Sequence, residues 1–391
     1  MRKSPVHTQG RSTSGRIQNV RFIEKFLTLT KSEKRMSLFT GPYENPFASS
    51  PDPTMQIALD LTRQTLSLAG APNVDTMALM VVPLTGFEHT ADHPWAGLRA
   101  HEEHYSGSLL KVAAMYAAFD LRSSADQLAT DGGLTTWPQI EAVLKSTFDP
   151  EIDAHTPSLI SGSPLLRPED KTRKPNYSAV LQLGAAGGDF VVDFTQAQLN
   201  AFEDMMVQQH NPGATTTIHG LGYPYLNGKI ADDGFFDGVG EGLWLAGDYT
   251  FGTQWPSARI PCVNDQDTAQ GTTAWHLAML LALLADDRLV GTKSSARMKE
   301  LMGRAGKFFP QTNPPIWSAN GRFVPTHGKV GIGSLKSGKS TFSEGLILRD
   351  TLRNLEFVVV WQNVIKSGQT DLQLFQPVAT LIEAAINGFL P

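Results

Sequence analysis

After residue 50, apolar residues recur at helical spacing in two long segments, one near the start of this region and one at the end of the chain. The stretch PTMQIALDLTRQTLSLAG, residues 53–70, has this spacing and ends in glycine, so it predicts an amphipathic helix. TMALMVVPLTG, which follows shortly after, is a short apolar run and predicts a strand. LQLFQPVATLIEAAINGFL repeats the helical spacing at the end of the chain and predicts a closing helix.

Helices dominate the predicted middle of the chain. A long apolar helix is expected over HYSGSLLKVAAMYAAFDLR, beginning just before Ser108, and another helix over TQAQLNAFEDMMVQQHN. TTAWHLAMLLALLADDRLV predicts a buried helix opened by a threonine cap, and SSARMKELMGRA predicts a further capped helix. Two stretches lack this spacing. Residues 149–177, rich in proline, serine and charge, predict an inserted loop, and residues 212–271 predict mostly loops.

Three strand patterns follow one another near the end of the chain: GRFVPTHGKVGIG, FSEGLILRD and LEFVVVWQNV. Their short connections predict antiparallel pairing. Together with the helix and strand at the front, they predict an α+β fold with an antiparallel sheet flanked by helices. We expect residues 51–105 and 285–391 to form the sheet domain, and residues 106–284 to form an inserted all-helical domain carrying the 149–177 loop.

Composition narrows the possible functions. The 391 residues carry a net charge of −5, which argues against a nucleic-acid surface, and the single Cys262 excludes an internal disulfide. The longest apolar run, LAMLLALLA, is too short to cross a bilayer. Residues 1–50 predict a basic, disordered arm without a recognisable secretory signal, so the compartment stays open, with the cytoplasm as default. The oligomeric state is equally open.

The segment from Gly333 to Ser340 matches the phosphate-binding pattern G-x-x-x-x-G-K-S. That pattern cradles phosphate only where it opens a helix, whose free N–H groups hold the anion. Here TFSEGLILRD follows, and its alternation predicts a strand. The sequence therefore predicts a turn between two antiparallel strands and no ATP site.

Ser108 and Lys111 form the one S-x-x-K in the sequence. Residues three apart share a helix face, so the lysine amine can lie beside the serine oxygen. A partly buried lysine loses its proton more easily and can then deprotonate the serine, while the helix N-terminus favours a developing oxyanion. The small, apolar flanks of SGSLLKVAAMYAA suit a buried helix start.

Four features in order resemble the serine β-lactamase and penicillin-binding protein superfamily, most closely its class A branch. A helix and strand lead to YSGSLLKVAA, which is similar to the S-x-x-K of the family. VQQHNPGA falls where the family has S-D-N, and TTAWHLAMLLALLADDRLVGTKSSARMKELM resembles its Thr-Thr helix and the next helix. HGKVGIG stands in the place of K-T-G, and the resemblance spans roughly residue 53 to the C-terminus.

The resemblance implies a role for each matching residue. Ser108 would be the acylated nucleophile, and Lys111 its base or proton relay. Asn211 would hold the substrate amide, and Lys329 would orient a substrate carboxylate. Gln209, Gly331 and Ile332 would line the substrate site, with the N–H groups of Ser108 and Ile332 forming the oxyanion hole. The implied partner is a small acyl substrate, and no cofactor is needed.

Two positions depart from the family pattern. Gln209 stands where the family has a hydroxyl that passes a proton to the leaving nitrogen, and an amide cannot do so. Val330 replaces the threonine of K-T-G and removes a hydroxyl that meets a carboxylate. An ester therefore fits better than a peptide, since an alkoxide leaving group needs less proton delivery than an amine.

Other residues compete for these roles. Tyr225 and Asn227 form a Y-x-N, the form used by another branch of the superfamily, and Lys336 in KSG rivals Lys329. The class A glutamate box is missing, so Glu241 is the candidate for activating the deacylating water. The histidines of HEEH (101–104) have the wrong spacing for zinc, and HTADH (89–93) falls in an expected loop, so no metal site is predicted.

Three hypotheses follow from the sequence. The first is a bacterial-type serine hydrolase, esterase-like or β-lactamase-like, that forms an acyl-enzyme on Ser108 and hydrolyses it. The second is a penicillin-binding-like protein that is acylated but barely turns over. The third is a catalytically silent binding or scaffold protein on the same fold.

Overall fold

The computed structural model describes residues 37–84, 92–161, 174–185, 187–238, 240–247, 249 and 258–390. Within them, the main sheet has five antiparallel strands in the order β10-β11-β12-β1-β2. Their bounds are β1 Ala78–Leu84, β2 Ala96–Leu98, β10 Phe323–Ser334, β11 Ser340–Asp350 and β12 Leu355–Lys366. The front strand thus pairs with the last strand of the chain, as expected, and the α+β prediction is confirmed.

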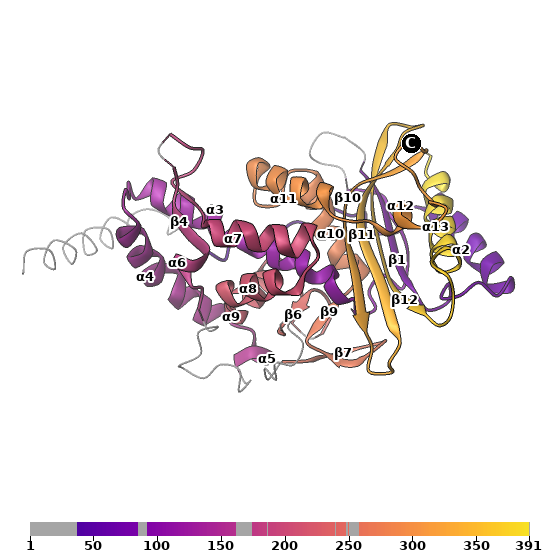
Figure 1. Ribbon diagram of the computed structural model, residues 1–391, viewed down its shortest axis with the longest axis horizontal. Coiled ribbons are helices and arrows are strands. Elements are labelled where there is room, and N and C mark those ends of the chain that lie inside the picture. Colours follow the sequence, from indigo (N-terminus) through magenta and orange to yellow (C-terminus); the bar gives the residue numbers. More distant parts are fainter. Residues whose placement is uncertain are drawn as a thin grey trace, which may run out of the picture.

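Helices cover both faces of this sheet (Figure 1). The helices α2 (Pro53–Leu68) and α13 (Asp371–Gly388) pack side by side on one face, where Leu79 and Val81 of β1 point. The helix α10 (Ala274–Ala285) covers the opposite face, toward which Met80 and Val82 point. Because both faces are buried, β1 is a continuous apolar run and not an alternating one.

Most of the remaining helices gather beyond α10, away from α2 and α13 (Figure 1). The 3₁₀ turn η1 (Gly107–Leu110) runs into α3 (Lys111–Asp131), which is buried on nearly all sides. Around it lie α4 Trp137–His155, α5 Ser158–Ser161, α6 Tyr177–Val180, α7 Gln196–Phe202, the π-helical turn η2 Glu203–Val207, α8 Asn211–Leu221 and α9 Tyr223–Asp232. The helices α11 (Thr292–Arg304) and α12 (Phe308–Gln311) lead back to the sheet.

Short strands make three small sheets beside these helices. The strands β3 (His104–Tyr105), β9 (Gln270–Thr272) and β6 (Trp244–Leu245) form one of them. The other two are hairpins, β4 (Leu181–Leu183) with β5 (Val192–Phe194), and β7 (Ile260–Cys262) with β8 (Gln266–Thr268). The strand β3 matters for function because it leads directly into η1.

The prediction of mostly loops over residues 212–271 is wrong. Both α8 and α9 lie there, each with proline in its first turn, a position where the missing N–H costs nothing. Every residue of α9 from Tyr223 to Ile230 is buried. A helix buried all round shows no polar face, so the periodic signal that identifies a helix is missing.

The expected loop at 149–177 begins too early, because α4 continues through Pro150 to His155. Phe148 and Ile152 of α4 are buried on either side of that proline and hold the helix in the core. Residues 162–173 lie outside the described part of the chain. The division into two domains stays a prediction.

The basic arm predicted over residues 1–50 ends earlier than expected. Residues 1–36 lie outside the described part, but residues 37–50 pack onto the helical side. Leu38, Phe39 and Phe47 are buried, and the Leu38 N–H donates to the Glu151 carboxylate at 2.7 Å. Residues 37–50 form no helix or strand and so show no periodic pattern of apolar residues. Their burial therefore could not be predicted from the sequence.

The phosphate-loop pattern is a turn, as predicted. It joins β10 to β11, and the Leu335 N–H donates to the Lys339 carbonyl at 2.8 Å. Gly338 has a φ of +79°, a conformation that glycine adopts without strain. Among the described residues, none of the helices has the length and apolar character needed to cross a membrane.

Candidate active site

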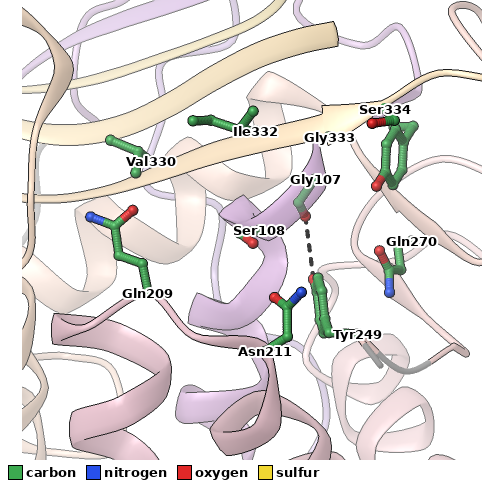
Figure 2. A pocket seen from close by; sticks show the side chains of 11 residues that line it. Gly107, Ser108, Gln209, Asn211, Tyr249, Gln270, Val330, Ile332, Gly333 and Ser334 are labelled. Carbon is green, nitrogen blue, oxygen red and sulfur yellow. Dashed lines mark hydrogen bonds between the residues drawn. The ribbon is translucent and has the colours of Figure 1, made fainter. Parts of the chain in front are cut away.

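A cavity of about 400 Å³ opens where η1 meets the edge strand β10 and the loop between η2 and α8. Figure 2 shows Ser108 in this cavity, with Val330 and Ile332 of β10 on one side and Asn211 on the other. The described lining residues are Tyr105, Gly107, Ser108, Gln209, Asn211, Tyr249, Gln270, Val330, Ile332, Gly333 and Ser334. Four residues predicted for the site, Ser108, Gln209, Asn211 and Ile332, therefore meet in one pocket.

Two glycines let the turn that carries Ser108 press against β10. Gly107 has a φ of +60°, and a Cβ there would lie 2.5 Å from the Ile332 carbonyl oxygen. A Cβ on Gly331 would lie 2.1 Å from the Ser106 carbonyl oxygen. That same carbonyl accepts a hydrogen bond of 2.6 Å from the Ser343 hydroxyl of β11. The backbone of the Ser108 turn is thus fixed beside the backbone of Ile332.

Lys111 opens α3, and its side chain is buried. Its Nζ donates to the carbonyls of Gln209 at 3.3 Å and His210 at 3.0 Å, and to Oδ1 of Asn211 at 2.9 Å. Burial lowers the pKa of Lys111 to about 8, although the Asp204 carboxylate opposes the shift. A substantial fraction of this amine is therefore neutral near pH 8 and can accept a proton.

The loop from η2 to α8 brings Asn211 to Lys111. Gln209 in that loop has a φ of +62°. Asp204 braces the loop, since its carboxylate accepts from the Gly213 N–H at 2.8 Å and contacts His210 Nδ1 at 2.7 Å. A Cβ at Gly213 would lie 2.5 Å from the Ala201 carbonyl, so only glycine allows this close return of the chain.

Lys329 lies beneath the pocket. It is fully buried, and its Nζ donates to the neighbouring Val330 carbonyl at 2.8 Å. Burial and, to a smaller extent, the charge of Lys111 together lower its pKa to about 7. Among the described lining residues the strand contributes Val330, Ile332, Gly333 and Ser334. Neither Lys329 nor Gly331 is among the described lining residues, and their proposed contacts with a substrate stay predictions.

The rival residues lie elsewhere. Tyr225 and Asn227 belong to the buried helix α9, not to the loop that the sequence predicted. The Tyr225 hydroxyl donates to the Ala117 carbonyl at 2.9 Å, and the Asn227 side chain donates to the Leu245 carbonyl at 2.8 Å. Glu241 is exposed and does not line the pocket. Lys336 lies in the β10–β11 turn, where it donates to the Asp265 carbonyl at 2.8 Å.

The described histidines of the two patterns contact other side chains. His101 stacks on Trp275, and His93 bonds Asp286 at 2.9 Å. His104 is buried, and its ring lies 3.7 Å from the Glu102 carboxylate. His89 lies outside the described residues. Within the part of the chain that the structure describes, no group of three or more His, Cys, Asp or Glu side chains could hold a metal.

Several lining residues were missed by the sequence, among them Tyr249, Gln270 and Tyr105. The Tyr249 hydroxyl donates to the Gly107 carbonyl at 3.3 Å, and the Lys111 Nζ lies 5.0 Å from its ring centroid (Figure 2). Gln270 comes from β9, and Tyr105 from β3, where its ring packs on Gly333. Tyr249 and Gln270 lie in the stretch without periodicity. Only Tyr105, three residues before Ser108, had a sequence position that pointed to the site.

Comparisons with known proteins agree on the architecture. No protein-family model and no curated protein matches the chain. Among solved structures, a class A β-lactamase of Bacteroides cellulosilyticus DSM 14838 shares 12% identity at a TM-score of 0.50, covering 86% of this chain and 99% of that one. The TLA-1 extended-spectrum β-lactamase shares 11% at a TM-score of 0.50, covering 85% and 98%. At these identities the likeness concerns the fold: the chain has the fold of the class A serine β-lactamases.

Proposed function

We propose that this protein is a serine acyl-transfer hydrolase that forms an acyl-enzyme on Ser108. The observation that carries the proposal is the position of Ser108 in the pocket, three residues from a buried lysine whose amine bonds Asn211 at 2.9 Å. A serine hydroxyl is a weak nucleophile until a base removes its proton, and a lysine with a pKa of about 8 can do so.

In the acylation step, Ser108 Oγ bonds to the carbonyl carbon of an ester or activated amide. The Ser108 proton passes to the neutral Lys111 amine, which gives up one of its three protein acceptors to receive it. The N–H groups of Ser108 and Ile332 stabilise the oxyanion. When the tetrahedral intermediate collapses, the bond to the leaving oxygen or nitrogen breaks, and Lys111 returns the proton to it.

In the deacylation step, water attacks the acyl carbon and releases the acid and free Ser108. The base for this step is Lys111, because Glu241 is exposed and outside the pocket lining. Asn211 and Gln209 hold the substrate through hydrogen bonds. Gln209 supplies no proton relay, so esters should react faster than amides, whose nitrogen must be protonated as it leaves.

One observation favours a second function, that of a slow acylator. The described lining residues include no carboxylate that could activate the deacylating water. Acylation then proceeds with the machinery around Lys111, while the acyl-enzyme persists. This alternative shares the nucleophile and differs in the rate of the second step.

Intact-mass spectrometry of wild type and Ser108→Ala separates these functions. The protein would be mixed with a fluorophosphonate, p-nitrophenyl acetate and a penicillin. We expect a wild-type adduct with the fluorophosphonate, turnover of the ester, and neither in Ser108→Ala. Adducts that persist with every substrate would identify the slow acylator. A wild type without adduct or ester turnover would leave a binding or scaffold role.

A further inference from the structure

The described pocket lining is uncharged. It presents the neutral amides of Gln209, Asn211 and Gln270 and the hydroxyls of Ser108 and Ser334. Its remaining side chains are aromatic or aliphatic, from Tyr105, Tyr249, Val330 and Ile332. The lining therefore offers hydrogen bonds and apolar contact without an ionic partner.

The two lysines beneath the pocket are already engaged. Lys329 is 0% exposed, and its Nζ is turned to the Val330 carbonyl at 2.8 Å. Lys111 donates to three protein oxygens at 2.9–3.3 Å. A carboxylate on a ligand would have to displace one of these oxygens to bond Lys111, and Lys329 is not among the described lining residues.

Two cations in the β7–β8 hairpin and the β10–β11 turn also have protein partners. Lys336 donates to the carbonyls of Asp265 and Asp267, each at 2.8 Å, and so connects the turn to the hairpin. Arg259 donates to the same Asp267 carbonyl at 3.1 Å, within the hairpin. They do not line the pocket.

Transfer of a ligand carboxylate into such a lining removes its water without supplying an opposite charge. That transfer is strongly unfavourable, whereas a neutral ester of similar size loses little hydration. A cavity of about 400 Å³ is in the range that holds a small organic molecule. The exposed face of Ile332 and the ring of Tyr105 suit an apolar acyl chain.

We propose that the site selects uncharged acyl substrates and discriminates against those that carry a carboxylate near the reacting carbonyl. This inference rests on the proposed acyl-transfer function and names its substrate class: small neutral carboxylic esters with an aliphatic or aromatic acyl group. The reaction releases a neutral alcohol and a carboxylic acid. The acid ionises as it forms, and the same lining that excludes anionic substrates then favours its departure.

A matched set of p-nitrophenyl esters tests the selection. The butyrate ends in a methyl group, mono-p-nitrophenyl succinate carries a carboxylate there, and methyl p-nitrophenyl succinate is the neutral control for size. The assay is run at roughly pH 7.5, where the succinate carboxylate is ionised. We expect kcat/KM to be at least about tenfold lower for the anionic ester than for either neutral ester. This ratio corresponds to about 1.4 kcal/mol. Equal or faster hydrolysis of the anionic ester would overturn the selection while leaving the hydrolase standing.

Loss of the proposed function gives a different result. If none of the three esters reacts at Ser108, the hydrolase proposal fails. The preference for uncharged ligands can then still be tested by calorimetry, which measures how tightly Ser108→Ala binds the corresponding p-nitroanilides. Tighter binding of the butyric anilide than of the succinic anilide supports an uncharged-ligand site, and the reverse order refutes it.

Charge at the mouth provides a second test. Ser334 is exposed at the end of β10 and lines the pocket, so Ser334→Arg would place a cation where an acyl carboxylate could reach it. The measured quantity is kcat/KM for the succinate divided by kcat/KM for the butyrate. This ratio should be about tenfold higher in Ser334→Arg than in the neutral control Ser334→Gln, because the arginine adds one charge-assisted hydrogen bond to the carboxylate. An unchanged ratio, with both variants folded, would show that charge does not set the preference.

Discussion

The two walls of the pocket differ in how closely they keep the expected chemistry. The helical wall assembles Ser108, Lys111 and Asn211 around one buried amine. The sheet wall presents Val330 and Ile332, and its lysine, Lys329, is turned inward to a backbone carbonyl. Under the proposed function, the helical wall carries out acylation and the sheet wall selects the acyl group. The proposal thus assigns reactivity and selectivity to different elements.

The largest expected effect breaks the helical wall. Lys111→Arg should lower the acylation rate by about 10³-fold, because general-base catalysis is worth roughly that factor and arginine stays protonated. The measurement is the second-order rate of fluorophosphonate labelling, followed by intact mass. Lys336→Arg is the control, since the Lys336 amine donates to backbone carbonyls of the neighbouring hairpin and does not line the pocket. A labelling rate of Lys111→Arg close to wild type would remove Lys111 as the base.

The next effect concerns the seam where the two walls meet. In Gly331→Ala, the new Cβ would lie 2.1 Å from the Ser106 carbonyl oxygen, which cannot move without displacing the Ser108 turn. We expect a loss of stability of about 1–3 kcal/mol, as for other overpacked sites, together with slower labelling of Ser108. Gly303→Ala in α11 is the control, because its Cβ would meet only ordinary contacts at 3.5 Å. Gly331→Ala should unfold at a lower temperature than Gly303→Ala and should be labelled more slowly at Ser108. Equal unfolding temperatures and labelling rates would mean that the backbone around Ser106 adjusts to the new Cβ at little cost.

Two asparagines sharpen the assignment of the helical wall. Asn211→Ala should reduce ester hydrolysis about tenfold or more, because a hydrogen bond to Lys111 and the substrate is lost. Asn227→Ala should leave the chemistry nearly intact. It should cost about 1–3 kcal/mol of stability, because it strands the buried Leu245 N–H and carbonyl. Hydrolysis rates and unfolding midpoints of both variants test this, and reversed results would move the site to α9.

These asparagines also show what the sequence could predict. The prediction of a helix beginning just before Ser108 agrees with η1 and α3, and the four longer strands of the sheet had clear patterns. Asn227 was misplaced in a loop because α9 is buried all round and carries no polar face. The inward turn of Lys329 had no signal either. Its side chain could equally have met a substrate, and only the packing of β10 determines its direction.

A smaller effect concerns the pH dependence of the helical wall. The pKa of Lys111, lowered to about 8 by burial, predicts ester hydrolysis that rises with pH through about 8, as the amine loses its proton. The Asp204 carboxylate raises this pKa, so Asp204→Asn should shift the rising limb to lower pH while an amide oxygen can still accept from Gly213. Profiles of kcat/KM for both proteins give the midpoints. A shift to higher pH would have the wrong sign for this electrostatic account.

The smallest expected effect lies beyond both walls, in the turn that mimics a phosphate loop. Lys339 follows Gly338 between β10 and β11, where the segment continues into a strand and offers no helix N-terminus to an anion. A phosphate-binding loop needs those free N–H groups, so ATP should show no saturable binding by calorimetry. Lys339→Ala should hydrolyse esters at the wild-type rate, because Lys339 is not among the described lining residues. Saturable ATP binding in the wild type that disappears in Lys339→Ala would mean that the turn binds nucleotide despite its β-hairpin geometry.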